Sequence, residues 1–136
     1  MPKIRHIALI TSCIVPNTKS GPITNFSKKQ RLNQLAKNIN FVSDTKILDH
    51  IYVIDPFLIN EKKKIEFKTK LHENGLRENS KINLIIFKPS KEIIKEIISR
   101  GKGYSELKMI IHCNKIIKRK HKNCIIHKIS GRYIIL

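Results

Sequence analysis

The sequence of 136 residues predicts a single α/β domain, with a mainly parallel sheet of about four strands and helices on both faces in a Rossmann-like, three-layer arrangement. Three observations predict this class. Short apolar runs of strand length alternate with longer stretches in which apolar residues recur at helical spacing. The apolar runs are continuous, which is typical of strands buried on both faces of a parallel sheet. Turn residues, mostly Pro, Gly, Asn and Ser, separate the segments.

The first half of the chain is expected to contain two strands and two helices. These are a strand over 3–12, a helix over 28–39, a strand over 50–55 and a helix over 60–74. The first run has a basic start like that of a signal peptide, but Thr11 interrupts its apolar residues and no cleavage site follows. Ser27 and Asn60 are the expected N-caps of the two helices, and Gly75 follows the second one. Pro56 ends the second strand.

The second half is expected to add two helices between two strands. These are a strand over 81–88, a helix over 90–100, a helix over 104–120 and a strand over 123–130. Pro89 closes the third strand, and Gly101 ends a helix in which an Ile-Ile pair recurs every four residues. The carboxyl ends of the four strands are therefore the expected place for a ligand, as in other open α/β sheets.

The strong positive charge leaves two interpretations open. The chain carries 28 Lys and Arg against 10 Asp and Glu, a formal net charge of +18. This charge suits a small basic nucleic-acid-binding α/β protein, which is the alternative function. However, the 22 Lys, 27 Ile and 11 Asn against 6 Arg are also the pattern of an AT-rich coding sequence, and the lysines are spread along the chain. Aromatic residues make up only 6% with no Trp, which argues against a base-stacking platform.

The cysteines predict a reducing compartment, so we expect a cytoplasmic protein. Cys13, Cys113 and Cys124 are an odd set without the spacing of a disulfide framework. His112 and Cys113 are adjacent on a helix and point about 100° apart. Cys124 and His127 lie on opposite faces of a strand, so neither pair predicts a zinc site.

The turn at residues 101–103 has two possible roles. Gly101, Lys102 and Gly103 lead into a helix, and such a turn exposes backbone N–H groups and one cation, which suits a phosphate. It follows a helix and not a strand, so it is not a P-loop. The alternative is a plain turn between two helices.

The last strand carries cations on one face. Lys128, Ser130 and Arg132 alternate along this face, and Gly131 permits a close approach of the backbone. Two neighbouring cations repel each other unless a diphosphate or an internal carboxylate, from Glu106 or Asp55, lies between them. The alternative is a strand that ends in a solvated Arg132.

The order of these features resembles a known family. The features are Thr11, Ser12 and Cys13 after the first strand, the helix over 28–39, Asp55 after the second strand, Lys102, Gly103 and Glu106, and finally Lys128, Ser130, Gly131, Arg132 and Tyr133. Together they resemble the nucleotide-sugar-binding N-terminal part of bacterial and viral GT-A-like glycosyltransferases from capsule, O-antigen and lipopolysaccharide gene clusters. The resemblance extends from about Ile7 to Tyr133.

The resemblance implies donor-binding roles. Thr11, Ser12 and Cys13 would contact the nucleotide, and Asp55 the base or ribose. Lys102, Lys128 and Arg132 would neutralise the diphosphate leaving group, with Glu106 orienting one of these cations. Four further residues would also belong to the set that binds the donor nucleotide and its diphosphate: Gly103, Ser130, Gly131 and Tyr133. Arg31 would serve the same pocket or cap the helix surface. Fixed cations can replace a metal. Because the sequence has no Asp-x-Asp pair, neither a divalent metal nor another cofactor is expected.

The resemblance covers a donor-binding domain over 1–136 and no acceptor-binding half. We therefore expect weak nucleotide-sugar binding with poor or absent transfer to a glycan or lipid-linked acceptor. A truncated gene product, one part of a split enzyme and an inactive donor-site remnant remain open. The apolar end of the last strand would be covered by a second chain or another copy, so an interaction module that completes another chain's fold is a third hypothesis.

Overall fold

The computed structural model describes residues 3–14 and 28–130, with Lys102 described by its backbone alone. Its elements follow the predicted order. They are β1 (Arg5–Thr11), α1 (Lys28–Asp44), β2 (His50–Ile54), α2 (Glu61–Glu73), β3 (Ile82–Ile85), α3 (Lys91–Arg100), α4 (Lys102–Lys120) and β4 (Cys124–Ser130). None of the helices in this described part combines the length and the apolar character needed to cross a membrane.

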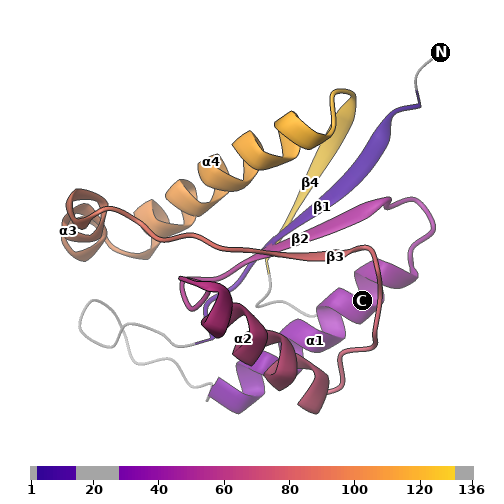
Figure 1. Cartoon of the computed structure of the whole chain (residues 1–136), viewed down its shortest axis with the longest axis horizontal. Helices are drawn as coiled ribbons and strands as arrows, with labels where there is room; N and C mark the ends of the chain where they lie inside the picture. The colour runs from indigo at the N-terminus through magenta and orange to yellow at the C-terminus, as the bar shows by residue number, and fades with distance from the viewer. Residues whose placement is uncertain (1–2, 15–27, 131–136) are drawn as a thin grey trace.

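The four strands form one parallel sheet in the order β3-β2-β1-β4. The chain moves outward from β1 to β2 and β3, and then crosses back to place β4 on the other side of β1. Crossovers between parallel strands are right-handed. The change of direction therefore sends α4 to the opposite face of the sheet from α1 and α2 (Figure 1). The predicted three-layer, Rossmann-like α/β class is confirmed.

Helices cover both faces of the central strand β1. Ile7, Ala8, Leu9 and Ile10 are all fully buried. Ala8 and Ile10 belong to the core under α1 and α2, while Ile7 and Leu9 belong to the core under α4. The main helical partners are Leu35, Ile39, Phe67 and Leu71 on the first face and Met109, Cys113 and Ile117 on the second. This double coverage explains why β1 reads as a continuous apolar run.

The expectation that every strand is buried on both faces is wrong for β4. This strand lies at an edge of the sheet, and Ile125 is 45% exposed. The apolar run in β4 therefore does not mark a central strand. A smaller difference concerns α1, which continues to Asp44 instead of ending near residue 39. Val42 is buried three residues after Ile39 and extends the helix face that packs on the sheet.

The helix ends follow the predicted capping chemistry where the structure describes them. The Asn60 side chain accepts a hydrogen bond of 2.8 Å from the Lys63 N–H, and Gly75 follows α2 with a φ of 100°. Ser27 lies outside the described residues, so its predicted cap is not placed. Gly101 both ends α3 and precedes α4, with φ 89° and ψ −166°.

The helix before Gly101 packs loosely. α3 contains no buried residue, and its Ile94 and Ile98 side chains are exposed. By contrast, α4 lies along the sheet and places Met109, Cys113 and Ile117 in the core. Burial raises the pKa of the Cys113 thiol to about 12, so this group remains protonated and packs as an apolar side chain.

Alanine substitutions at Gly101 and Gly103 are expected to change the free energy of unfolding in opposite directions. Gly101 occupies a backbone region that is essentially restricted to glycine, so Gly101→Ala is expected to lower the free energy of unfolding by about 1–3 kcal/mol. Gly103 is helical, and a Cβ there meets no atom within 4 Å. Gly103→Ala is therefore expected to raise the free energy of unfolding by up to about 1 kcal/mol. Urea unfolding measures both, and two changes of the same sign would contradict this backbone assignment.

Candidate functional site

A crevice lies where the sheet reverses its direction of growth. The chain goes from β1 through α1 to β2 on one side, while β4, which follows α4, lies on the other side of β1. Ligands of open α/β sheets bind at such a switch point. A cavity of about 60 Å³ is present there, and we call it the switch-point crevice. It is lined by Thr11, Ser12, Cys13, Pro56, Ser105, Glu106, Met109 and Ser130.

Three side chains from three elements meet beside this crevice, and two of them line it. The Thr11 hydroxyl of β1 donates a hydrogen bond of 3.0 Å to Glu106 Oε1 of α4. The Lys128 ammonium of β4 lies 2.9 Å from the same oxygen. Strand register produces this arrangement, because Leu9 pairs with Lys128 and Thr11 with Ser130. Glu106 is thus the internal carboxylate that contacts a cation of the last strand.

Asp55 lies beneath the crevice and is 1% exposed. Its Oδ2 accepts hydrogen bonds from the Ser12 hydroxyl at 2.7 Å and the Ile14 N–H at 3.0 Å. Its Oδ1 accepts one of 2.8 Å from the Phe57 N–H. Burial raises the pKa of this carboxyl, although these hydrogen bonds and the charge of Arg31 act in the opposite direction.

This geometry differs from the role that the resemblance implied for Asp55. Both carboxylate oxygens bond to the protein, and the residue does not line the crevice. Asp55 instead fixes the segment after β1 against the segment after β2. Arg31 has a similar position, since it is buried and donates a hydrogen bond of 2.7 Å to the Cys13 carbonyl. Arg31 therefore supports the backbone after β1 from α1, and it neither lines the crevice nor lies on the helix surface.

The amino end of α4 adjoins the crevice, since Ser105 and Glu106 line it. The N-cap Gly101 forms no side-chain hydrogen bond with α4, and the first turn has no acidic residue. By contrast, α2 and α3 each have a side-chain cap and a Glu in the first turn. The first N–H groups of a helix carry a partial positive charge. Among the residues that the structure describes, neither a side-chain cap nor an acidic first-turn residue of α4 offsets that charge.

Several expected site residues lie outside the described residues, namely the side chain of Lys102 and the whole of Gly131, Arg132 and Tyr133. The structure brings Thr11, Ser12, Cys13, Glu106, Lys128 and Ser130 together. Gly103 is exposed in the first turn of α4 and does not line the crevice.

Sequence reasoning missed three lining residues: Pro56, Ser105 and Met109. Met109 follows Glu106 by three positions, so the helical repeat predicts that both lie on one face of α4. The helical spacing from Glu106 is therefore the sequence signal that predicts Met109 as a lining residue.

The histidine and cysteine pairs considered for zinc take separate positions. Cys124 packs against the core under α4. His127 lies on the other face of β4, where its Nε2 is 3.1 Å from Nδ1 of His6 and the two rings stack. His112 contacts the Ile86 carbonyl at 3.0 Å. Cys124 and His127 therefore lie on opposite faces, as the alternation of a strand predicted.

Asp55 provides a stability prediction. Asp55→Ala leaves the Ser12 hydroxyl and the Ile14 and Phe57 N–H groups without their acceptor, so the free energy of unfolding is expected to fall by about 3 kcal/mol or more. Asp44→Ala is the matched control, because this carboxylate forms an exposed ion pair with Arg77 and its loss is expected to cost less than about 1 kcal/mol. Equal losses in guanidinium unfolding would show that Asp55 does not fix the two segments.

These contacts are the basis for assigning a function. No family model, curated protein or solved structure matches it. The positions and chemistry of the residues at the switch-point crevice therefore carry the functional argument.

Proposed function

We propose that this protein binds the diphosphate of a nucleotide sugar at the switch-point crevice and belongs to the metal-independent, GT-A-like type of glycosyltransferase. One observation carries the proposal: beside the crevice where the sheet reverses direction, the Lys128 ammonium pairs with Glu106 near the start of α4, and the amino end of α4 has no side-chain cap. Both are sources of positive charge at the position where α/β sheets bind ligands. The sequence resemblance adds the nucleotide sugar as the class of ligand.

The crevice offers several kinds of contact to a diphosphate. The first turn of α4 offers backbone N–H groups, and the helix dipole is equivalent to roughly half a positive charge at this end. Ser105 and Ser130 add hydroxyl groups. Lys128 adds a full charge, and its side chain is 34% exposed, so solvent and ligands can reach it. The cavity of about 60 Å³ is small, so the sugar and base would lie outside it.

Glu106 holds Lys128 at the crevice. An ammonium group has three donors, and the bond to Glu106 uses one of them. Lys128 can therefore keep this ion pair while it donates to a phosphate oxygen. The Lys128 ammonium balances the charge of the Glu106 carboxylate, and the Thr11 hydroxyl donates a hydrogen bond to it, so its repulsion of an anion is lowered.

The proposed chemistry is displacement at the anomeric carbon. The bond from this carbon to the diphosphate oxygen breaks, the acceptor hydroxyl oxygen forms the new bond, and its proton passes to a base. Charge grows on the departing nucleoside diphosphate, where Lys128 and α4 stabilise it. Among the described crevice residues, the one carboxylate is Glu106, which is engaged by Thr11 and Lys128. We therefore expect binding by this chain with little or no turnover.

The same proposal includes the partners and the compartment. The acceptor would be a glycan or a lipid-linked sugar, and a second chain or another copy would supply the acceptor site and cover the end of β4. We assign the protein to the cytoplasm because Cys13, Cys113 and Cys124 form no disulfide.

Isothermal titration calorimetry with UDP-, GDP- and CMP-sugars tests the proposal. One of these ligands is expected to bind weakly, and Lys128→Ala is expected to weaken it by about tenfold, the effect of losing roughly 1.4 kcal/mol of charge interaction. Lys122→Ala is the control, because Lys122 is exposed just before the opposite end of β4.

Two results would reject the proposal. One is the absence of heat with every nucleotide sugar, and the other is equal affinity of the Lys128→Ala and wild-type proteins. A single-stranded and a duplex DNA oligonucleotide serve as further ligands. If they bind with an affinity that falls steeply with salt while no nucleotide sugar binds, this result supports the nucleic-acid alternative that the net charge of +18 suggests.

A further inference from the structure

The outer edge of β3 is open. β3 is a terminal strand, and within the described part of the chain no strand pairs with its far side. The Ile51 N–H donates to the Lys81 carbonyl. Alternate residues of a parallel strand direct their backbone groups to opposite sides, so the N–H and C=O of Leu84 point away from β2. Such groups are a template for a further strand.

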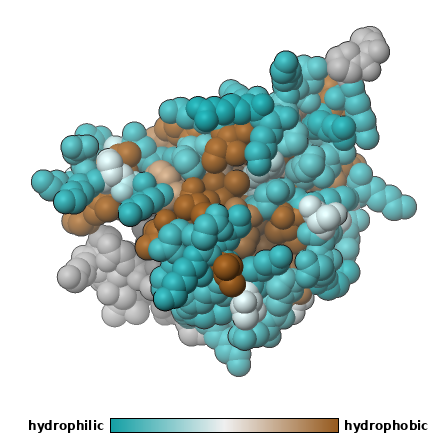
Figure 2. Space-filling model, viewed as in Figure 1, coloured by the Kyte–Doolittle hydropathy of each residue, from teal (hydrophilic) through white to brown (hydrophobic). Residues whose placement is uncertain are grey.

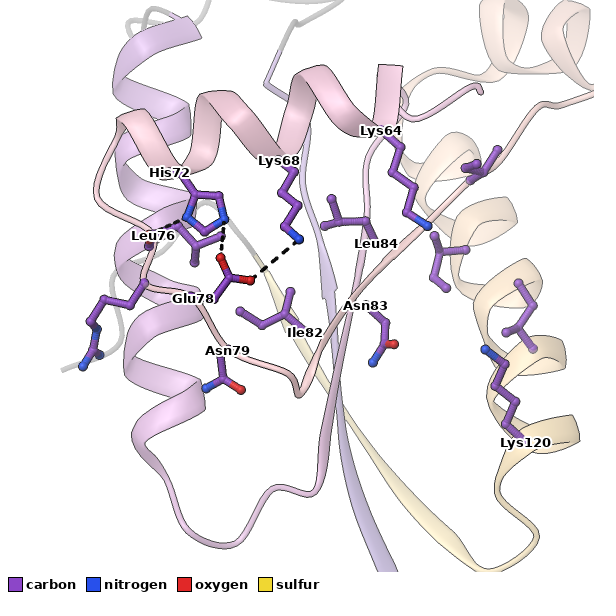
Figure 3. Close-up of a pocket in the computed structure, with 14 residues that line it drawn as sticks. Lys64, Lys68, His72, Leu76, Glu78, Asn79, Ile82, Asn83, Leu84 and Lys120 are labelled. Atoms are coloured by element: carbon purple, nitrogen blue, oxygen red, sulfur yellow. Dashed lines mark hydrogen bonds and ion pairs between the residues drawn. The ribbon is translucent and has the colours of Figure 1, made fainter. Parts of the chain in front are cut away.

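A groove of about 540 Å³ follows this edge. Its lining comes from β3, from α2 on one side and from α4 on the other (Figure 3). Leu84 belongs to the core under α1 and α2, whereas Ile85 belongs to the core under α4, and both line the groove. Because residues from both faces of β3 contribute, the groove occupies the position of a fifth strand.

The groove has an apolar floor. Ile82, Leu84, Ile86 and Ile116 line it. In the space-filling view, hydrophobic side chains run across the middle of this face, between hydrophilic side chains above and below (Figure 2). A strand placed here would therefore cover apolar surface in addition to forming backbone hydrogen bonds.

The walls of the groove are positively charged. Lys64 and Lys68 extend from α2, and Lys120 extends from α4 toward the same space (Figure 3). Lys68 has a long ion pair of 3.8 Å with Glu78, whose side chain is 80% exposed, so the pair contributes little. Among the described residues, Lys64 and Lys120 form no ion pair. Negative side chains on an incoming strand would find complementary charges here.

Two other occupants fit this surface less well. A second copy of the chain would bring its own Lys64 and Lys120 toward the same lysines, and like charges repel. A single-stranded nucleic acid would use the lysines, but it gains from aromatic side chains on which bases stack. The described lining contains isoleucines and leucines and no Phe, Tyr or Trp.

We infer that the β3 edge binds an extended, acidic polypeptide segment, which adds as a strand beside Leu84. Acidic side chains on one face of that segment contact Lys64 and Lys68, and apolar side chains on the other face pack on Ile116. This surface lies along an edge of the sheet and not at the switch-point crevice, so it does not depend on the proposed glycosyltransferase activity.

A fluorescein-labelled decapeptide of alternating Glu and Val is the first probe. Fluorescence anisotropy is expected to show binding, and Lys64→Glu is expected to weaken it by about tenfold or more. Lys62→Glu is the matched control: it makes the same charge change on α2, and Lys62 is exposed and lies about 200° away around the helix. Its affinity is expected to stay within about twofold of wild type. Circular dichroism confirms that both variants are folded.

Amide hydrogen exchange on the wild-type protein tests the backbone pairing separately. At saturating peptide, the Leu84 N–H is expected to exchange more slowly, because it becomes a donor to the added strand. Unchanged exchange at Leu84, with the peptide bound, would overturn strand addition. So would equal weakening by Lys64→Glu and Lys62→Glu, which would show that net charge alone drives binding.

Three further results would also overturn the inference. The first is the failure of the Glu-Val peptide to bind, and the second is equally tight binding of a Lys-Val decapeptide. The third is a different occupant. Binding of a single-stranded DNA decamer that Lys64→Glu weakens, without peptide binding, would indicate nucleic acid, and a dimer in sedimentation analysis that shields Leu84 would indicate a second copy.

Discussion

The buried Asp55 carboxylate is the constraint on which the crevice depends. The β1–β2 ladder fixes the chain up to the pairing of Thr11 with Ile54. Beyond that point, Asp55 holds the chain in place, because it accepts hydrogen bonds from both the segment that leaves β1 and the segment that leaves β2. Arg31 adds a second support through the Cys13 carbonyl. A carboxylate is costly to bury, and the three hydrogen bonds to Asp55 offset that cost while they fix the loop geometry at the crevice.

The order of the elements could be predicted from the sequence because strands and helix ends carry local signals. Asn60, Gly75 and Gly101 mark helix ends, and the structure places them there. The position of β4 could not be predicted in this way. Its sequence is as apolar as that of a central strand, but the direction of the last crossover decides which neighbour it receives. That direction is a property of the whole sheet, which explains why an edge strand was expected to be buried.

The candidate site was predictable only in part. The rule that ligands bind at the carboxyl ends of parallel strands led to Thr11, Ser12 and Ser130, which line the crevice. The same rule also selected Asp55, whose side chain turns inward. The difference arises because backbone N–H groups of the adjoining loops satisfy Asp55, and their positions depend on the folded geometry. The groove along β3 carries no local signal either, since it exists only where α2 and α4 overhang an edge strand.

The loose attachment of α3 has a consequence for how this domain can diversify. The helix buries no residue, and it is joined to α4 through Gly101, whose N–H donates a hydrogen bond to the Ile97 carbonyl of α3. The helical segment Lys91–Arg100 can therefore lengthen, shorten or be replaced at small cost to the sheet. Since α4 begins beside the crevice, new sequence inserted there would come next to the proposed ligand site. Related domains could thus acquire different selectivities without rebuilding their common framework.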